Sequence, residues 1–408
     1  MFREFRRRLW QPPRAHGDVI EDRSVSFLEL FYDLVYVVVI GRAAATLAHE
    51  ITWQSVAEFA VIFGLIWLAW VNSTSLYDLH GREDVRTRSY VFIQMLLVAL
   101  LAVFSGDAAG SGGTSFALVY GVFLLLVTWL WYSVRRQDTE EFADVTRSWL
   151  TLLSITTLWL FASAAVPSGV RMTMWALFVV TWVVVTVVLG RSESAVSDES
   201  ILVSDSLVER FGLFTIIVLG EVIVGVVDGL GEAEHDLKTI ATGLVGLMIG
   251  FGLWWSYFDL VGRRQPHDDG RGFPLWVVWH LPLTASIATT GAAMVTLIEH
   301  AADPRAPVGA ALLVTGSVAV GLISLIMIVR TLQDFEALRA VFVPTSLGMV
   351  GGAAAALLIG VWRPAPIVLV ASLAIVQTLV WLFGIDRWLR AEMAGAQRSG
   401  GDLGDSSA

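Results

Sequence analysis

Runs of about twenty apolar residues recur along almost the whole chain, and this pattern constrains the fold more than any other feature. Each run is long enough to cross the roughly 30 Å hydrocarbon core of a bilayer as an α-helix. Only short polar breaks separate the runs from Phe27 to Ile385. The 408 residues are 56% hydrophobic and 16% charged, with a mean hydropathy of +0.69, which excludes an ordinary soluble domain. We therefore expect an all-α polytopic membrane protein.

The apolar runs predict twelve transmembrane helices. Breaks rich in turn-forming residues separate them, such as GDAAGSGG after the third run and VPSGVR after the fifth. The expected spans are approximately 27–47, 55–79, 89–106, 115–134, 147–166, 170–190, 206–228, 238–260, 274–298, 307–329, 342–361 and 365–386.

The distribution of basic residues predicts the orientation of these spans. Cytoplasmic loops of membrane proteins carry an excess of Lys and Arg. With the N-terminus in the cytoplasm, the basic residues outside are only Arg171, Lys238, Arg305 and Arg363. Twelve spans then return the C-terminus to the cytoplasm. The expected location is the bacterial cytoplasmic (inner) membrane.

Two sequence matches at nearly the same spacing indicate an internal duplication. SLYDLHGRED at 75–84 resembles SYFDLVGRRQ at 256–265, and LELFYDLVYVVVI at 28–40 aligns with VERFGLFTIIVLG at 208–220. This offset covers six spans and preserves topology, so we expect two parallel six-helix repeats related by an axis along the membrane normal. The expected organisation is a basic cytoplasmic arm at 1–24, a first repeat at 25–195, a second repeat at 196–390 and a disordered cytoplasmic tail at 391–408.

The first span carries a polar stripe on an otherwise apolar helix. Glu29, Asp33 and Tyr36 are spaced i, i+4 and i+7, which places them on one face. One interpretation puts the two carboxylates at the membrane interface, where they would favour the helix N-terminus. The other turns the stripe toward the bundle interior, because a lipid-facing carboxylate at the depth of Asp33 is costly. Arg42, on roughly the opposite face, is expected to extend to the outer headgroups or to pair with a carboxylate on another helix.

The seventh and ninth spans add two deeply placed titratable residues. Glu209 occupies the position of Glu29 in the second repeat, and Glu221 lies about 18 Å further along the axis. An acid at that depth is either functional or a structural hydrogen-bonded group. His280 precedes Pro282 within the ninth span and is a candidate proton carrier, or else a merely hydrogen-bonded histidine. We predict a polar solute or ion path lined by Glu29, Asp33, Tyr36, Glu221 and His280.

The repeated D-L-x-G-R pattern closes the second and eighth spans. Glycine permits a tight turn there, and arginine can bind an aspartate or a lipid phosphate. We therefore interpret Asp78 with Arg82, and Asp259 with Arg263, as cytoplasmic loop clamps. Architecture is favoured over catalysis for these residues.

Motifs for nucleotide-driven pumping or hydrolysis are missing from the sequence. It contains no GxxxxGK[ST], HExxH or GxSxG pattern and no cysteine, and its net charge is −10. We therefore expect no catalytic residues, no metal, no cofactor and no nucleic-acid partner. The expected partners are the lipid bilayer, a proton or ion, and an unidentified small solute. The sequence does not determine oligomerisation.

Two long motifs carry a resemblance to a known family. They are E-L-F-Y-D-L-V-Y-V at 29–37 and E-R-F-G-L-F-T-I-I-V-L-G-E at 209–221. With WWSYFDL and HLPL, they resemble the bacterial low temperature requirement protein A family from about residue 24 to 390. The resemblance implies a multi-pass inner-membrane protein linked by its name to growth in the cold, and it implies no established substrate or reaction.

Three functional classes fit these observations. We favour a secondary transporter or permease, because repeated bundles with acids at membrane depth are typical of ion-coupled carriers. An integral-membrane enzyme acting on lipid or a lipid-linked substrate would use the same carboxylates and His280 as acid and base. A membrane-adaptation protein without transport is the third alternative.

Overall fold

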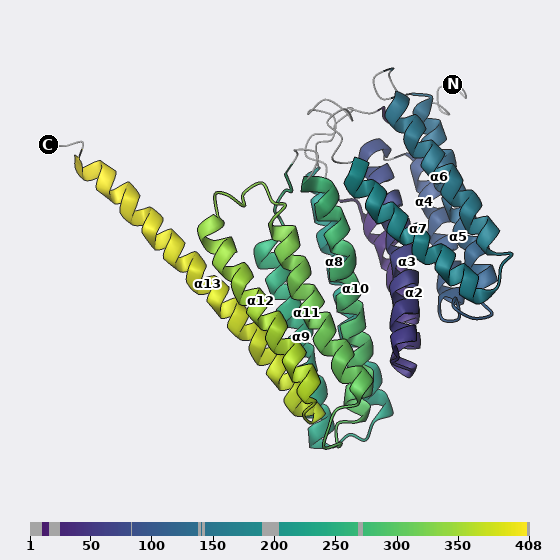
Figure 1. The fold of residues 1–408 in the computed structure, drawn as a ribbon. Helices are drawn as coiled ribbons and strands as arrows, with labels where there is room; N and C mark the ends of the chain where they lie inside the picture. Colours follow the sequence, from purple (N-terminus) through teal and green to yellow (C-terminus); the bar gives the residue numbers. More distant parts are fainter. Residues whose placement is uncertain are drawn as a thin grey trace. The chain divides into compact units, whose positions relative to one another are not determined.

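The computed structural model describes residues 10–15, 25–82, 84–137, 140, 143–189, 204–267 and 272–405. Within these residues the chain forms twelve α-helices (Figure 1). They are α2 Phe27–His49, α3 Trp53–His80, α4 Val85–Ser105, α5 Gly113–Arg135, α6 Ala143–Ser163, α7 Ser168–Leu189, α8 Asp205–Glu232, α9 Leu237–Leu260, α10 Gly272–Glu299, α11 Val308–Val329, α12 Arg339–Trp362 and α13 Pro366–Asp405. Each predicted span overlaps one of these helices, which confirms the all-α polytopic fold class.

Length and apolarity identify eleven of the helices in the described part of the chain as candidate membrane spans. The remaining helix, α6, contains Asp144, Arg147 and several hydroxyl residues, so its average hydropathy is lower. At 21 residues it is nevertheless long enough to cross the hydrocarbon core. The helices leave many large apolar side chains exposed, as expected for surfaces that lipid rather than water solvates.

Side-chain caps explain where several helices begin. Ser26 accepts a hydrogen bond from the backbone N–H of Glu29, and the Glu29 carboxylate accepts one from the backbone N–H of Ser26. Thr52, Asp84 and Asp236 cap α3, α4 and α9 in the same way, each accepting from the N–H three residues later. A cap satisfies one of the N–H groups that the first helical turn leaves without a partner.

The chain divides into two compact units, and each is described separately below. The first comprises Met1–Glu221 and His267–Leu281, and the second comprises Val222–Pro266 and Pro282–Ala408. Helices α8 and α10 therefore contribute residues to both units. The repeat boundary expected near residue 195 differs from these divisions, and the two-repeat organisation stays a prediction.

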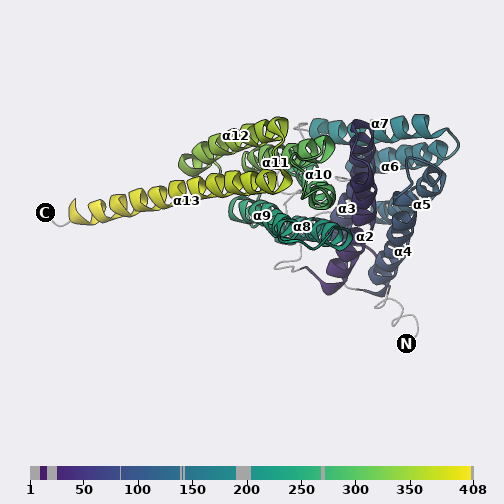
Figure 2. The same cartoon turned by 90° about the horizontal axis from the view of Figure 1, so that it is seen from below.

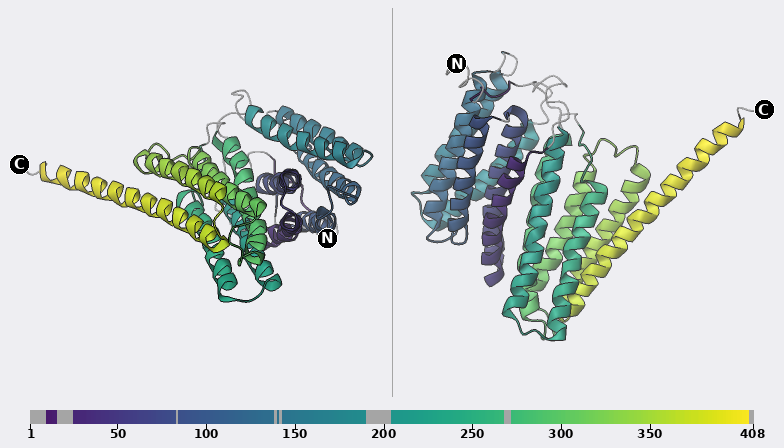
Figure 3. Two further views of the ribbon diagram at one scale, coloured as in Figure 1. Left: turned by 60° about the horizontal axis from the view of Figure 1, so that its bottom comes forward. Right: turned by 180° about the vertical axis from the view of Figure 1, so that it is seen from behind.

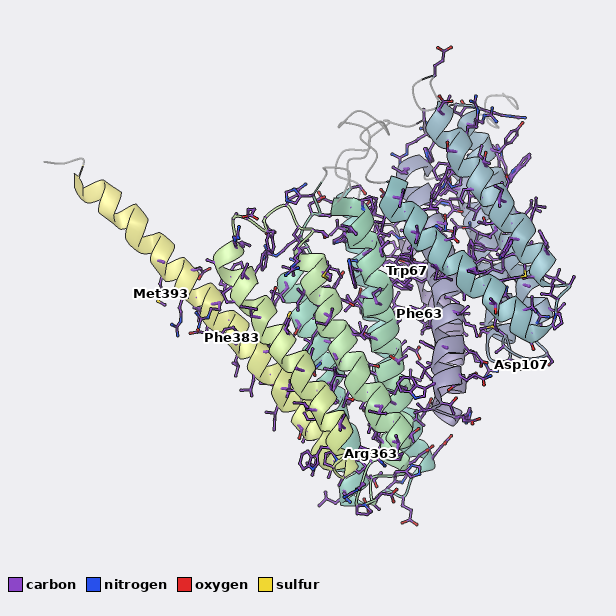
Figure 4. All side chains as sticks on the ribbon, in the orientation of Figure 1. Phe63, Trp67, Asp107, Arg363, Phe383 and Met393 are labelled. Atoms are coloured by element: carbon purple, nitrogen blue, oxygen red, sulfur yellow. The ribbon has the colours of Figure 1, made fainter. Side chains whose placement is uncertain are left out.

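In the first unit α2 packs against α3 and α4, while α7 packs against α3 and α6. Helix α3 is the centre of this unit, with Trp67 and Trp70 fully enclosed. Phe63 and Trp67 lie among the side chains of α3 (Figure 4). The aromatic core keeps the polar groups of α2 away from lipid.

In the second unit α12 packs between α11 and α13, and α9 packs against α13 and α11. The C-terminal part of α13 extends beyond the other helices of its unit (Figure 1, Figure 2 and Figure 3). The pairs α3 with α7, α3 with α5 and α5 with α6 in the first unit correspond in chain order to α9 with α13, α9 with α11 and α11 with α12 in the second. This correspondence is what a duplication would produce.

Candidate functional site

Asp33 is fully buried and holds a buried arginine. Its Oδ1 lies 2.5 Å from Nη2 of Arg210 on α8, and its Oδ2 accepts a second, longer hydrogen bond of 3.4 Å from Nε of the same side chain. Trp70 on α3 donates its indole N–H to Asp33 Oδ1 at 2.8 Å. All three side chains have 0% exposure. Charges so enclosed persist only when paired and hydrogen-bonded, which this arrangement achieves.

Glu29 lies one helical turn before Asp33 and contacts both Arg210 and Ser26. Its Oε1 is 3.6 Å from Arg210 Nη1, and its Oε2 accepts hydrogen bonds of 2.9 Å from the backbone N–H and the hydroxyl of Ser26. Both earlier interpretations of this residue therefore describe part of its surroundings: it caps the start of α2, and it also faces the interior. Arg210 Nη1 is buried without a hydrogen-bond partner, so the ion pair with Glu29 is looser than that with Asp33.

The cluster of Glu29, Asp33 and Arg210, which we call the charge triad, contains two carboxylates and one guanidinium. Arginine stays protonated at all accessible pH values. Both carboxylates therefore face the same guanidinium in a water-poor interior. A site of this kind favours taking up one proton or one cation.

Aromatic rings enclose the charge triad. Trp70 stacks on Phe214 with centroids 4.1 Å apart and meets Phe211 edge-on at 4.9 Å. The guanidinium carbon of Arg210 lies 6.0 Å from the centre of the Trp70 ring, within the range of a cation–π contact. The rings exclude water, so interactions among the three charges are weakly screened.

His280 belongs to the same aromatic cluster. Its ring lies 4.9 Å from Phe211 and 4.3 Å from Trp276, and Nδ1 is 2.7 Å from the carbonyl oxygen of Trp276. The side chain is fully buried. Phe211 thus connects His280 to Trp70 by ring packing, and the predicted role of His280 as a proton carrier stays a prediction.

Tyr36 begins a separate polar network. Its hydroxyl is 2.8 Å from that of Tyr32, and the Tyr32 ring meets the ring of Tyr77 on α3 edge-on with centroids 6.5 Å apart. Gln94 on α4 donates to Ser73 at 3.2 Å and accepts from the Tyr77 hydroxyl at 2.8 Å. The network is buried and joins α2, α3 and α4 beside the charge triad.

Glu221 is buried, with 4% exposure, and lies against Gly41 of α2. A Cβ added at Gly41 would be 3.1 Å from Oε1 and 3.2 Å from Oε2 of Glu221, so glycine allows the close approach. Gly41 is eight residues beyond Asp33, about 12 Å along the helix axis. Glu221 therefore occupies a different level of α2 from the charge triad.

Asp78 and Arg82, the first of the two proposed loop clamps, each have partners in the structure. Asp78 is buried and accepts hydrogen bonds of 2.7 Å from Ser204 and 2.6 Å from Ser206 at the start of α8. Arg82 donates through Nε to the carbonyl of Pro12 at 3.0 Å.

Asp259 and Arg263 form the equivalent pair in the second unit. Asp259 accepts from the Trp381 indole N–H at 2.9 Å. Arg263 is exposed, and its neighbour Arg264 forms the ion pair with Asp334. In each unit the aspartate hydrogen-bonds a neighbouring helix: Asp78 of α3 bonds the start of α8, and Asp259 of α9 bonds α13. The role of these aspartates as loop clamps stays a prediction.

Arg210 was assigned to the cytoplasmic side on the basis of the Lys and Arg distribution and was not predicted as a site residue. The sequence does contain a feature that could have indicated a site role for Arg210, because this residue follows Glu209 in the motif at 209–221. Glu209 is exposed whereas Arg210 is fully buried, so the aligned acid at position 209 does not reproduce the environment of Glu29. Arg42 is exposed, as its expected extension toward headgroups requires.

Among the described residues no group of three or more His, Cys, Asp or Glu side chains is arranged to hold a metal ion. Comparison with known proteins adds the family. The description "Bacterial low temperature requirement A protein (LtrA)" matches residues 24–380. The chain belongs to the LtrA family.

A curated relative extends this result without assigning a reaction. The LtrA-family chain is 26% identical over 292 residues to the uncharacterized protein RA0937 of Rhizobium meliloti (strain 1021). The match covers 66% of this chain and 68% of the relative. No solved structure matches the chain.

Proposed function

We propose that this LtrA-family protein is a secondary transporter that couples movement of a small solute to a proton or cation at the charge triad. The observation that carries the proposal is the pairing of two carboxylates with one fully buried arginine inside membrane-spanning helices. A purely structural ion pair needs only one acid for each arginine. The second acid supplies a group whose charge changes with proton or cation binding.

The unequal ion pairs suggest how coupling would work. Arg210 is bound tightly by Asp33 and loosely by Glu29, so protonating either carboxylate leaves a neutral pair with the other. Each acid comes from α2 and the arginine from α8. A change in which acid holds Arg210 would therefore bias the packing of these two helices, which is the kind of differential contact that alternating access requires.

The test is transport by purified protein in liposomes with an imposed pH gradient. A panel of charged and neutral solutes is added, while an internal pH dye and a solid-supported membrane record proton and charge movement. The wild-type protein should produce solute-dependent proton or cation flux. Glu29→Gln and Asp33→Asn should abolish the flux per inserted molecule while membrane insertion is retained.

Glu209→Gln provides the matched control. It removes a carboxylate adjacent to Arg210 on the same helix, but this side chain is exposed, so flux should persist. Loss of abundance in Asp33→Asn, with normal flux in the remaining protein, would instead assign the triad to structure. Lipid turnover without flux would support the enzyme alternative and overturn the proposal.

A further inference from the structure

A cavity of about 340 Å³ lies in the second unit among α9, α12 and α13. Its walls include Ser256, Val341, Thr345, Met349, Val380 and Ile385. Cavities of this size fall within the range that binds small organic ligands. From Val341 to Met349 the wall follows α12 for eight residues, so it reaches about 12 Å along the helix.

A more polar recess of about 470 Å³ adjoins this cavity, and both share Asp259 and Arg264. The recess is lined by two arginines, Arg263 and Arg264, and by two aspartates, Asp259 and Asp334. Among the described residues its charged lining is therefore balanced. A ligand carrying both a positive and a negative group complements such a lining better than an anion does.

The charged groups are held in place by neighbouring side chains. Arg264 pairs with Asp334, and its guanidinium carbon lies 5.4 Å and 5.5 Å from the ring centres of Phe342 and Trp388. Trp381 holds Asp259 through a 2.9 Å hydrogen bond.

Backbone contacts fix the two loops that form the recess. An isolated antiparallel bridge joins Pro266 to Leu332, and the Gln333 N–H donates to the Gln265 carbonyl at 3.0 Å. The recess is therefore preorganised.

The cavity and the recess meet near the end of α9 and the start of α12. Asp259 lies at the last turn of α9, and Val341 lies in the first turn of α12. Trp381 and Trp388 line the cavity there, and tryptophan is enriched where membrane meets water. An apolar cavity below a charged recess matches the two parts of a membrane lipid.

We propose that this composite pocket binds a glycerophospholipid with a primary ammonium headgroup, of the phosphatidylethanolamine type. Arg263 and Arg264 bind the phosphate, and the exposed Asp259 accepts hydrogen bonds from the ammonium. An acyl chain fills the cavity along α12. The site lies wholly in the second unit and is independent of the charge triad.

The test measures lipid adducts of the full-length protein by native mass spectrometry. Dioleoyl phosphatidylethanolamine, phosphatidylcholine and phosphatidylglycerol are titrated in parallel. The ethanolamine lipid should bind about tenfold more tightly than the other two, because choline cannot donate N–H bonds and glycerol lacks the positive charge. Equal binding of all three would overturn the assignment.

Variants then locate the site. Asp259→Asn and Arg263→Gln change exposed residues and should each weaken ethanolamine-lipid binding about tenfold, and Ile385→Trp should do so by filling the cavity. Glu336→Gln is the control, because this exposed acid pairs with Arg339 at the start of α12 but lines neither hollow. Equal weakening in the control, or full binding by Ile385→Trp, would refute the site.

A soluble headgroup distinguishes a lipid from a polar solute. Glycerophosphoethanolamine, which lacks acyl chains, should fail to displace the lipid at equal concentration. Displacement would show that the charged recess acts alone, and the lipid assignment would be wrong.

Discussion

Removing Arg210 should destabilise the protein more than removing the charge of Asp33, and removing both should restore part of the loss. Arg210→Gln removes the cation that both buried carboxylates contact. Loss of one partner from a buried ion pair costs about 3–5 kcal/mol. Asp33→Asn instead leaves Arg210 paired with Glu29 and keeps an acceptor for the Trp70 indole N–H, so its cost should be about 1–3 kcal/mol.

The double variant removes the guanidinium and one carboxylate together. It should therefore be more stable than Arg210→Gln alone by about 0.5–3 kcal/mol, the usual range of coupling between contacting residues. Thermal unfolding of detergent-purified protein, followed by the loss of the monodisperse size-exclusion peak, ranks the three variants. Arg210→Lys tests the contribution of geometry, because lysine keeps the positive charge but cannot bind a carboxylate in the bidentate manner of a guanidinium.

Strict additivity of the two single changes would refute the reasoning. It would mean that Asp33 and Arg210 do not interact in the folded protein, despite the 2.5 Å contact. Arg210→Gln as stable as wild type would refute it as well, because an enclosed pair of acids would then carry no penalty.

Two further predictions concern local structure. Gly41→Val should lower the free energy of unfolding by about 1–3 kcal/mol, because the added atoms would meet Glu221. In the same unfolding assay, Gly41→Val combined with Glu221→Ala should recover part of that loss. Asp236 caps α9, and hydrogen bonds from the backbone and side chain of Thr239 lower the pKa of Asp236. The stabilisation that this cap provides is therefore fully present above the ordinary aspartate pKa of about 3.9. It is lost as the pH falls through the lowered pKa. The protection factor of the Thr239 amide, which corrects the exchange rate for its intrinsic pH dependence, should therefore fall below that ordinary value in wild type but not in Asp236→Asn. Equal pH profiles of the protection factor would contradict this role.

The fold class could be predicted from the sequence because its cause is local. An apolar run that enters a bilayer must satisfy its backbone hydrogen bonds within itself, so each run becomes a helix whatever its neighbours are. The twelve helices follow from this rule, including α6, whose hydropathy is weak but whose length is sufficient. The polar stripe of α2 was equally visible, because helical periodicity alone places Glu29, Asp33 and Tyr36 on one face.

The partners of that stripe were not predictable in the same way. Arg210 is separated from Asp33 by 177 residues, and charge counting treated it as one basic residue among many on the cytoplasmic side. Tyr36 shares a face with Asp33, yet its hydroxyl bonds Tyr32 rather than the charge triad. Likewise Arg264, and not the motif residue Arg263, forms the ion pair with Asp334.

By itself the sequence determined which segments are helical, where several of them begin and which faces carry charge, since these depend on residues within a few turns of each other. Only the tertiary structure decided that one arginine serves two acids, that Glu221 lies against Gly41 at another level, and that α9, α12 and α13 enclose a cavity. The physical reason is that a helix in lipid can rotate and shift at little cost to its own hydrogen bonds. Its rotation is set by packing against neighbours distant in the chain.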